Sequence, residues 1–177
     1  FLQFAQKDNS MLVVGDSGIY VIRANNENYL INLSDNFEKN ESNLIKSLNY
    51  CKIYEINRIF SPTNINISGI SQLKHTKQIF SAKENLECFH ISDRLTAVKT
   101  KIGGKTFLFI KSLQDETDKQ ILEYQYVLQD FDVVINMSDF DVDLETKLCI
   151  TSKDFKYDEN WTMGLEGDTL GVKRSLS

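Results

Sequence analysis

Short apolar runs separated by turn-forming residues dominate this sequence and restrict what it can fold into. Met11–Val14 and Ile19–Ile22 have strand composition, and Gly15–Gly18 between them is typical of a tight turn. Tyr29–Leu33 follows a second turn at Asn25–Asn28. The opening of the chain is therefore predicted to be an antiparallel meander.

Two later stretches have helical periodicity instead. The first can be capped by Asp35 or Asn36, and the second covers Asp115–Gln129. Its acidic first turn suits the positive end of a helix. Their apolar positions are Phe37, Leu44, Ile45 and Leu48 in the first stretch, and Ile121, Leu122, Tyr126 and Val127 in the second.

Further strands alternate with these helices. They are predicted at Arg58–Phe60, Gln78–Phe80, Glu87–Ile91, Leu95–Ile102, Thr106–Ile110, Phe131–Ile135 and Lys147–Thr151, with a short helix at Ser68–Leu73 and a last hairpin within Trp161–Leu176. Runs of antiparallel strands punctuated by helices predict an α/β protein, built as a layered sandwich with its helices outside.

The length and the net charge limit the domain count and the classes of function. The 177 residues suit one domain, for which we assign 1–10 as a lead-in segment or edge strand and 11–177 as the domain itself. The chain begins at Phe1, which we expect to mark a processed form or an excised domain. The net charge of −5 opposes general nucleic-acid binding. No apolar run approaches the roughly 18 residues of a membrane span.

Four lysines around the Gly103-Gly104 turn are the candidates for a local basic patch. They are Lys99, Lys101, Lys105 and Lys111. Alternate residues on paired strands share a face, so the four predict either a nucleic-acid contact or, as the favoured interpretation, a solvated strand face.

Cysteines and histidines are few. Cys51, Cys88 and Cys149 form no CxxC pair, so we interpret all three as small core residues. His90 lies two residues after Cys88, a spacing that allows a metal pair, but neither it nor His75 has an evident third ligand.

The polar loop within Ile59–Ile70 follows a predicted strand. The carboxyl ends of strands are where α/β proteins build their active sites. This loop has Ser, Thr and Asn, but no His, Asp, Glu or Cys. We interpret it as an active-site loop from which the reactive residues are missing.

Several other motifs have simpler explanations. Gly15–Gly18 matches a serine-protease motif but lacks a supporting His, so a turn explains it. Gly103–Thr106 ends like a P-loop, but a strand is predicted after it instead of a helix.

The alternating Asp139, Asp141 and Asp143 indicate an acidic surface loop, or a weak divalent-cation site. Tyr124, Tyr126, Phe131 and Trp161 are spaced as core or half-buried residues rather than as a base-stacking platform.

Three segments fit known sequence patterns. Met11–Ile22 fits the pattern FLDVGQGDSILI at equal length, although a rival register places Phe1–Gln6 on FLDVGQ. Leu30–Ser34 resembles the hairpin end IDGG, with Asn32 in place of the Asp, and Ile59–Gly69 fits the metal motif THxHxDHxGG without gaps. With the order of elements, these matches resemble the metallo-β-lactamase fold, in particular the C-terminal domain of ComEC-type DNA-uptake (competence) proteins.

Later segments continue the resemblance. Leu95–Lys99 resembles the NSLVL-type strand, and Phe107–Ser112 resembles FLFTGD, with Ser112 at the bridging Asp. Asp132–Ile135 resembles DVLKV, which precedes a His-His-Gly-Ser motif. The positions that correspond to metal ligands are occupied by Asn32, Ser61, Thr63, Ile65, Asn66, Ser112, Ser138 and Asp139.

The resemblance implies an αββα sandwich of two facing mixed sheets with outer helices, and a vestigial cleft in place of a two-zinc site. Hydroxyls and amides bind Zn²⁺ poorly and Ile65 has no donor atom, so we expect no metal, no cofactor and no hydrolysis. The implied parent is a bacterial inner-membrane protein, with single-stranded DNA or the channel domains of the same chain as partners. The alternatives are a divalent-metal hydrolase that uses Asp139–Glu145, and an unrelated α/β interaction module.

Overall fold

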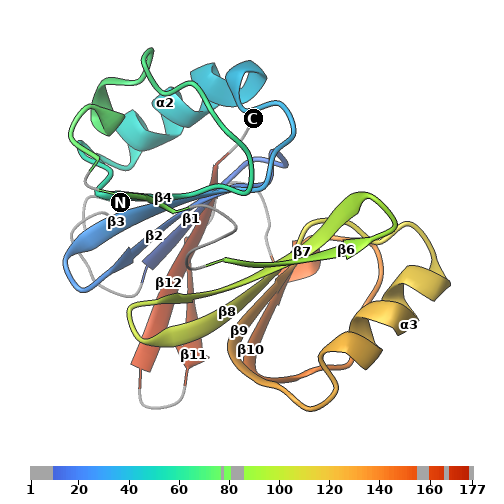
Figure 1. Ribbon diagram of the computed structural model, residues 1–177. Helices are drawn as coiled ribbons and strands as arrows, with labels where there is room; N and C mark the ends of the chain where they lie inside the picture. The colour runs from blue at the N-terminus through green and yellow to red at the C-terminus, as the bar shows by residue number, and fades with distance from the viewer. Residues whose placement is uncertain (1–9, 77, 81–85, 155–159, 166–167, 176–177) are drawn as a thin grey trace. The chain divides into compact units, whose positions relative to one another are not determined.

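Two mixed β-sheets form the framework of the computed structural model, which describes residues 10–76, 78–80, 86–154, 160–165 and 168–175 (Figure 1). The chain divides into two compact units, each with one sheet. The first unit joins Phe1–Glu84 to Phe155–Ser177, and the second is Asn85–Asp154. Mixed sheets with helices confirm the predicted α/β class.

The first unit has a seven-stranded sheet in the order β11-β12-β1-β2-β3-β4-β5. Its strands are β1 (Ser10–Val14), β2 (Ile19–Ala24), β3 (Glu27–Asn32), β4 (Arg58–Phe60), β5 (Gln78–Phe80), β11 (Asn160–Leu165) and β12 (Asp168–Ser175). The predicted antiparallel meander of β1, β2 and β3 is confirmed, as is the antiparallel hairpin of β11 and β12. β4 and β5 add in parallel, and β12 pairs in parallel with β1.

Two tight turns shape the meander. The first contains Gly15 and Gly18 at φ values of 52° and 80°, a region that glycine enters without steric cost. The Ser17 hydroxyl donates to the Val14 carbonyl at 2.6 Å within this turn, so its role here is structural. Asn25 and Asn26 both have positive φ, as a type I′ hairpin turn requires.

The helix α2 (Glu41–Tyr50) supplies Leu44 and Leu48 to the core on one face of this sheet. The predicted caps are wrong. A 3₁₀ turn, η1 (Glu38–Asn40), precedes α2, and the side chain of Asn40 donates to Asn36 O at 2.9 Å instead of capping the helix. The predicted second helix of this unit is reduced to the 3₁₀ turn η2 (Ser71–Leu73).

The second unit has a five-stranded sheet in the order β10-β9-β8-β7-β6. Its strands are β6 (Glu87–Ile91), β7 (Arg94–Ile102), β8 (Lys105–Ile110), β9 (Asp130–Asn136) and β10 (Glu145–Thr151), followed by the 3₁₀ turn η3 (Ser152–Asp154). β6, β7 and β8 are antiparallel, whereas β9 and β10 add in parallel. Gly103 and Gly104 turn the chain from β7 directly into β8, so the P-loop resemblance has no helix to support it.

The helix α3 (Glu116–Gln125) covers one face of this sheet (Figure 1). Asp115 caps it, because its Oδ1 accepts a hydrogen bond from Asp118 N at 2.9 Å. The helix ends four residues before the predicted end. The predicted apolar stripe is therefore half wrong: Leu122 and Tyr126 are buried, but Ile121 and Val127 are 39% and 62% exposed.

The prediction that all three cysteines are core residues is correct only in part. Cys51 is buried and Cys88 is half-buried, but Cys149 is exposed. Cys149 lies on β10, the last strand of its sheet, and its neighbour Ile150 takes the buried position in the alternation. In the described part of the chain, neither α2, α3 nor any 3₁₀ turn has the length and apolar content of a membrane span.

Candidate functional site

Asn32 and Ser61 meet at one end of the first sheet. β3 and β4 are parallel neighbours with Ile31 opposite Phe60, so the residues that follow these two lie side by side. Asn32 Nδ2 donates to Ser61 Oγ at 3.1 Å, and Asn32 Oδ1 accepts from Ser34 N at 3.0 Å. Both side chains are buried. The structure therefore brings together two of the residues at which the resemblance implies a vestigial cleft.

The loop after Ser61 uses its polar groups internally. Ser61 Oγ donates to the carbonyl of Thr63 at 2.7 Å, while the Thr63 side chain is exposed. Ile65 packs against the core beneath α2. Asn66 Oδ1 accepts from both the backbone N–H and the hydroxyl of Ser68, at 3.1 and 2.7 Å. No cluster of ligands results from these contacts.

The other predicted cleft residues belong to the second unit. Ser138 follows β9, and its hydroxyl donates to Asn136 Oδ1 at 2.6 Å. Asn136 Nδ2 in turn donates to the carbonyl of Phe140 at 2.7 Å, which closes a small network around a buried amide. The neighbouring Asp139 is exposed.

An ion pair beside Ser112 was missed by sequence reasoning. Arg94 Nη2 lies 2.6 Å from Asp118 Oδ2, and Arg94 Nη1 lies 3.5 Å from Ser112 Oγ. Asp118 also accepts from Gln114 N at 2.8 Å. This backbone hydrogen bond, together with Arg94, holds the pKa of the Asp118 carboxyl below its usual value. The pair joins the start of α3 to the start of β7.

The four candidate lysines do not share one face of their sheet. Lys99 and Lys101 pair with Leu108 and Thr106, whereas Lys105 pairs with Ile102 and so lies on the opposite face. Lys111 is six residues after Lys105, so the same alternation places it on the face of Lys105. Lys99 is also engaged: its Nζ lies 2.7 Å from Gln129 Oε1 and 3.6 Å from Glu87 Oε2.

The acidic run after β9 is the surface loop that the sequence indicates. Asp139, Asp141 and Asp143 are exposed, and Asp141 pairs with Lys153 at 3.5 Å. The alternate residues Phe140, Val142 and Leu144 pack against the core beneath α3. Nowhere in the described ranges do three or more His, Cys, Asp or Glu side chains gather closely enough to hold a metal ion.

The two histidines lie in different units. His75 and His90 are both exposed. Burial raises the pKa of the half-buried Cys88 thiol, which opposes its use as a thiolate ligand beside His90.

Aromatic residues divide between core and surface. Tyr126 and Phe131 are buried and pack edge to face with centroids 5.5 Å apart, and burial raises the pKa of Tyr126 to about 12. Tyr124 is 83% exposed, so its prediction as a core or half-buried residue is wrong. The Trp161 side chain lies outside the described part of the chain.

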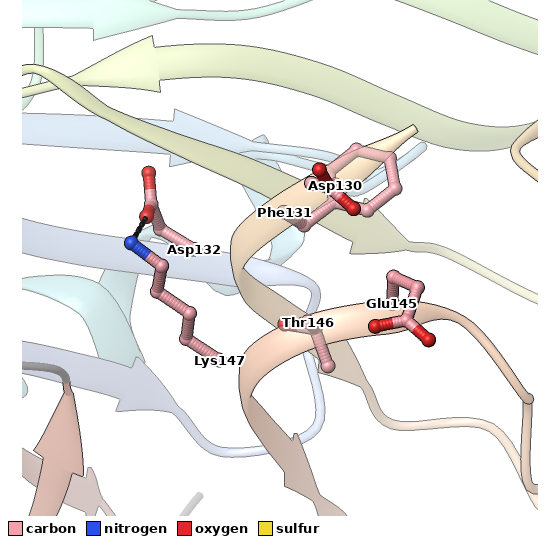
Figure 2. Close-up of a pocket in the computed structure, with 6 residues that line it drawn as sticks. All are labelled: Asp130, Phe131, Asp132, Glu145, Thr146 and Lys147. Atoms are coloured by element: carbon pink, nitrogen blue, oxygen red, sulfur yellow. Dashed lines mark ion pairs between the residues drawn. The ribbon is translucent and has the colours of Figure 1, made fainter. Parts of the chain in front are cut away.

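A hollow of about 400 Å³ opens at the starts of β9 and β10 (Figure 2). It is lined by Asp130, Phe131, Asp132, Glu145, Thr146 and Lys147. Asp132 lies 3.3 Å from Lys147 and accepts from Thr106 N at 2.8 Å. Partial burial alone would raise the pKa of the Asp132 carboxyl. The hydrogen bond from Thr106 N and the nearby Lys147 ammonium outweigh burial, so the pKa lies below its usual value. Sequence reasoning missed the hollow because it searched the carboxyl ends of strands.

No family model matches this chain, and neither a curated protein nor a solved structure shows significant similarity to it.

Proposed function

We propose that this chain is a non-catalytic metallo-β-lactamase-like domain of a ComEC-type DNA-uptake protein, with a structural or partner-binding role. The observation that carries the proposal is the chain of hydrogen bonds at the strand ends, in which Asn32 donates to the Ser61 hydroxyl and Ser61 donates to the Thr63 carbonyl. In a two-zinc hydrolase, the corresponding positions would present ligands to the metals.

The chemistry of these residues supports a role without hydrolysis. Asn32 and Ser61 are buried and donate to protein acceptors, and Ile65 is half-buried and packs against a hydrophobic core. A neutral amide and a hydroxyl that are already hydrogen-bonded neither attract Zn²⁺ nor lower the pKa of a bound water. The same holds for Ser138, whose hydroxyl is bonded to Asn136.

The proposal includes the layered arrangement that the resemblance implies. Each sheet has a second apolar face, away from its own helix. In the first unit this face contains Met11, Val13, Tyr20 and Ile22, and in the second unit it contains Val98, Phe107, Phe109 and Val133. Apolar sheet faces are stable when covered, as the inner faces of layered sandwiches are.

A protein partner suits the charge distribution better than DNA does. The net charge is −5, and the four lysines around the Gly103-Gly104 turn are divided between two faces. The channel domains of the proposed parent chain are therefore the partners we favour. Fluorescence anisotropy with a labelled single-stranded oligonucleotide checks this preference. Tight binding that weakens in a Lys99→Ala/Lys101→Ala variant would move the proposal to a DNA-binding role.

The central test is metal content combined with activity. After purification in the presence of zinc, we expect far less than one metal ion per chain by elemental analysis, and no nuclease or esterase activity above a buffer blank. Stoichiometric zinc or manganese, with hydrolysis that disappears in Asp139→Ala, would overturn the proposal and favour the acidic-loop hydrolase.

A further inference from the structure

The outer side of α3 and the turn after it expose a group of large apolar side chains. Ile121, Tyr124, Val127 and Leu128 are 39%, 83%, 62% and 95% exposed. Ile121 and Tyr124 are three residues apart on the helix, so they lie on one side of it. The opposite side supplies Leu122 to the core. Single exposed apolar residues are ordinary, but four within eight residues form a patch that points to an interaction.

The surroundings of this patch are strongly acidic. Between Asp115 and Glu145 the sequence has ten acidic residues and one lysine. The acidic loop lies against the helix, because Glu123 Oε2 accepts a hydrogen bond from Asp143 N at 2.7 Å. Negative charge therefore borders the apolar side chains, both on α3 and on the neighbouring loop.

The hollow at the starts of β9 and β10 lies close to the same patch along the chain. Asp130 is only two residues beyond Leu128, and it lines the hollow together with Glu145 (Figure 2). Lys147 is paired with Asp132, whereas Asp130 and Glu145 are exposed and form no ion pair within the described ranges. A volume of about 400 Å³ lined by carboxylates and the Phe131 ring suits the cationic end and methylene stem of Lys or Arg.

We propose that this acidic α3 face, made of Ile121, Tyr124, Val127 and Leu128 with Glu123, Asp130, Asp143 and Glu145, binds a basic amphipathic segment of a protein partner. The apolar side of that segment packs on Tyr124 and Leu128. Its lysine or arginine side chains reach the bordering carboxylates, one of them entering the hollow.

The negative charge around the acidic α3 face favours a basic segment over the other candidate partners. A second copy of the chain would bring the same acidic border against itself, and an anionic membrane surface would be repelled. The inference deepens the proposed function and rests on its binding role. It does not depend on the state of the zinc-ligand positions, so the metal test and the binding test can fail separately.

A synthetic peptide of about 14 residues, built from Leu and Lys as an amphipathic helix, is the probe. Its binding is measured by fluorescence anisotropy against wild type, Tyr124→Ser/Leu128→Ser and Tyr54→Ser. Tyr54 is 71% exposed in the other unit and is the matched control. We expect binding to wild type and Tyr54→Ser, and at least about tenfold weaker binding to the double variant. Circular dichroism verifies that all three are folded.

Two further comparisons separate charge from shape. Asp130→Asn/Glu145→Gln is expected to weaken binding severalfold and to reduce its salt dependence. A scrambled peptide of the same composition, which cannot form an apolar face, is expected to bind at least about tenfold more weakly than the amphipathic one. Equal binding of both peptides, or equal affinity of wild type and the double variant, would overturn the proposal. So would a dimer, seen by analytical ultracentrifugation, that the double variant abolishes.

Discussion

At the scale of single residues, the hydrogen bonds around Asn32 hold together the ends of β3 and β4 in the first unit. Asn32 is fully buried, and its amide uses Ser61 Oγ and Ser34 N as partners. A buried amide that loses a partner retains its full desolvation cost. Ser61 is therefore expected to matter for the stability of the fold.

Ser61→Ala should destabilise the fold by about 1–3 kcal/mol, because Asn32 Nδ2 loses the nearer of its two acceptors and the Thr63 carbonyl loses its donor. Urea denaturation measures the change. Thr63→Ala is the matched control, since the Thr63 side chain is exposed and only its carbonyl is used; we expect a change within about 0.5 kcal/mol. Equal effects of both substitutions would show that the Asn32 network contributes no stability.

The second residue-scale prediction concerns Asp118 and pH. Its pKa is lowered in the folded state by Gln114 N and Arg94, relative to about 3.9 in an unfolded chain. A lowered pKa adds stability above the unfolded value, and this stability is lost as the pH falls through the folded value. Asp118→Asn should therefore be less stable than wild type at pH 7, and the difference should shrink below about pH 4.

Denaturation midpoints at pH 7 and in steps down to about pH 3 test this dependence. Asp93→Asn is the control, because Asp93 is an exposed carboxylate in the turn between β6 and β7. We expect its stability difference from wild type to stay small throughout. A pH-independent effect of Asp118→Asn would assign the loss to packing or capping instead of to the ionised carboxylate.

At the scale of elements, α3 has two apolar sides with different roles. Leu122 is fully buried with Tyr126 and Phe131, whereas Leu128, just beyond the helix, is 95% exposed. The early end of the helix at Gln125 separates these roles, because the residues after it no longer follow helical spacing. The same residue type is thus used once for stability and once, as we infer, for binding.

Leu122→Ala should cost about 2–5 kcal/mol in the free energy of unfolding, because it leaves a cavity between α3 and the sheet. Leu128→Ala should change stability by less than about 0.5 kcal/mol. Urea denaturation of both variants compares the effect of the same Leu→Ala substitution at a buried and at an exposed position. A large loss in Leu128→Ala would mean that the acidic α3 face is covered within the folded chain, and would contradict its availability to a partner.

At the scale of the whole molecule, β11 and β12 complete the sheet of the first unit. β12 pairs in parallel with β1, and β11 pairs with β12, so residues separated by the entire second unit complete one sheet. Without them, β1 would be an apolar edge strand with unpaired backbone groups. Such edges promote aggregation.

Deletion of residues 155–177 is expected to expose the edge of β1, lower the melting temperature and cause aggregation. Size-exclusion chromatography and a thermal melt measure both effects. A chain that ends at residue 175, after β12, is the control and should behave like wild type. A shortened chain that remains monomeric with an unchanged melt would show that β11 and β12 contribute nothing to the first unit.

Local patterns were sufficient to predict most strands and turns. Apolar runs such as Met11–Val14 and glycine turns such as Gly103-Gly104 encode their conformation within a few residues. The polar loop after β4 was also recognised from sequence, since its residue types exclude strong metal ligands. The start and end of helices were predicted less well. No side chain caps α2, since Asn40 bonds to Asn36 O instead, so no capping residue marks its start in the sequence, and α3 ends at Gln125 although the predicted helix continues to Gln129.

Sequence alone thus determined the α/β class, the meander and the absence of reactive residues in the Ile59–Ile70 loop, all of which depend on local chemistry. Only the tertiary structure decided that β12 joins β1, that the lysines divide between two faces, and that Tyr124 and Leu128 are exposed beside an acid-lined hollow. Strand partners and exposure depend on residues far apart in the chain, whose contacts no local pattern records.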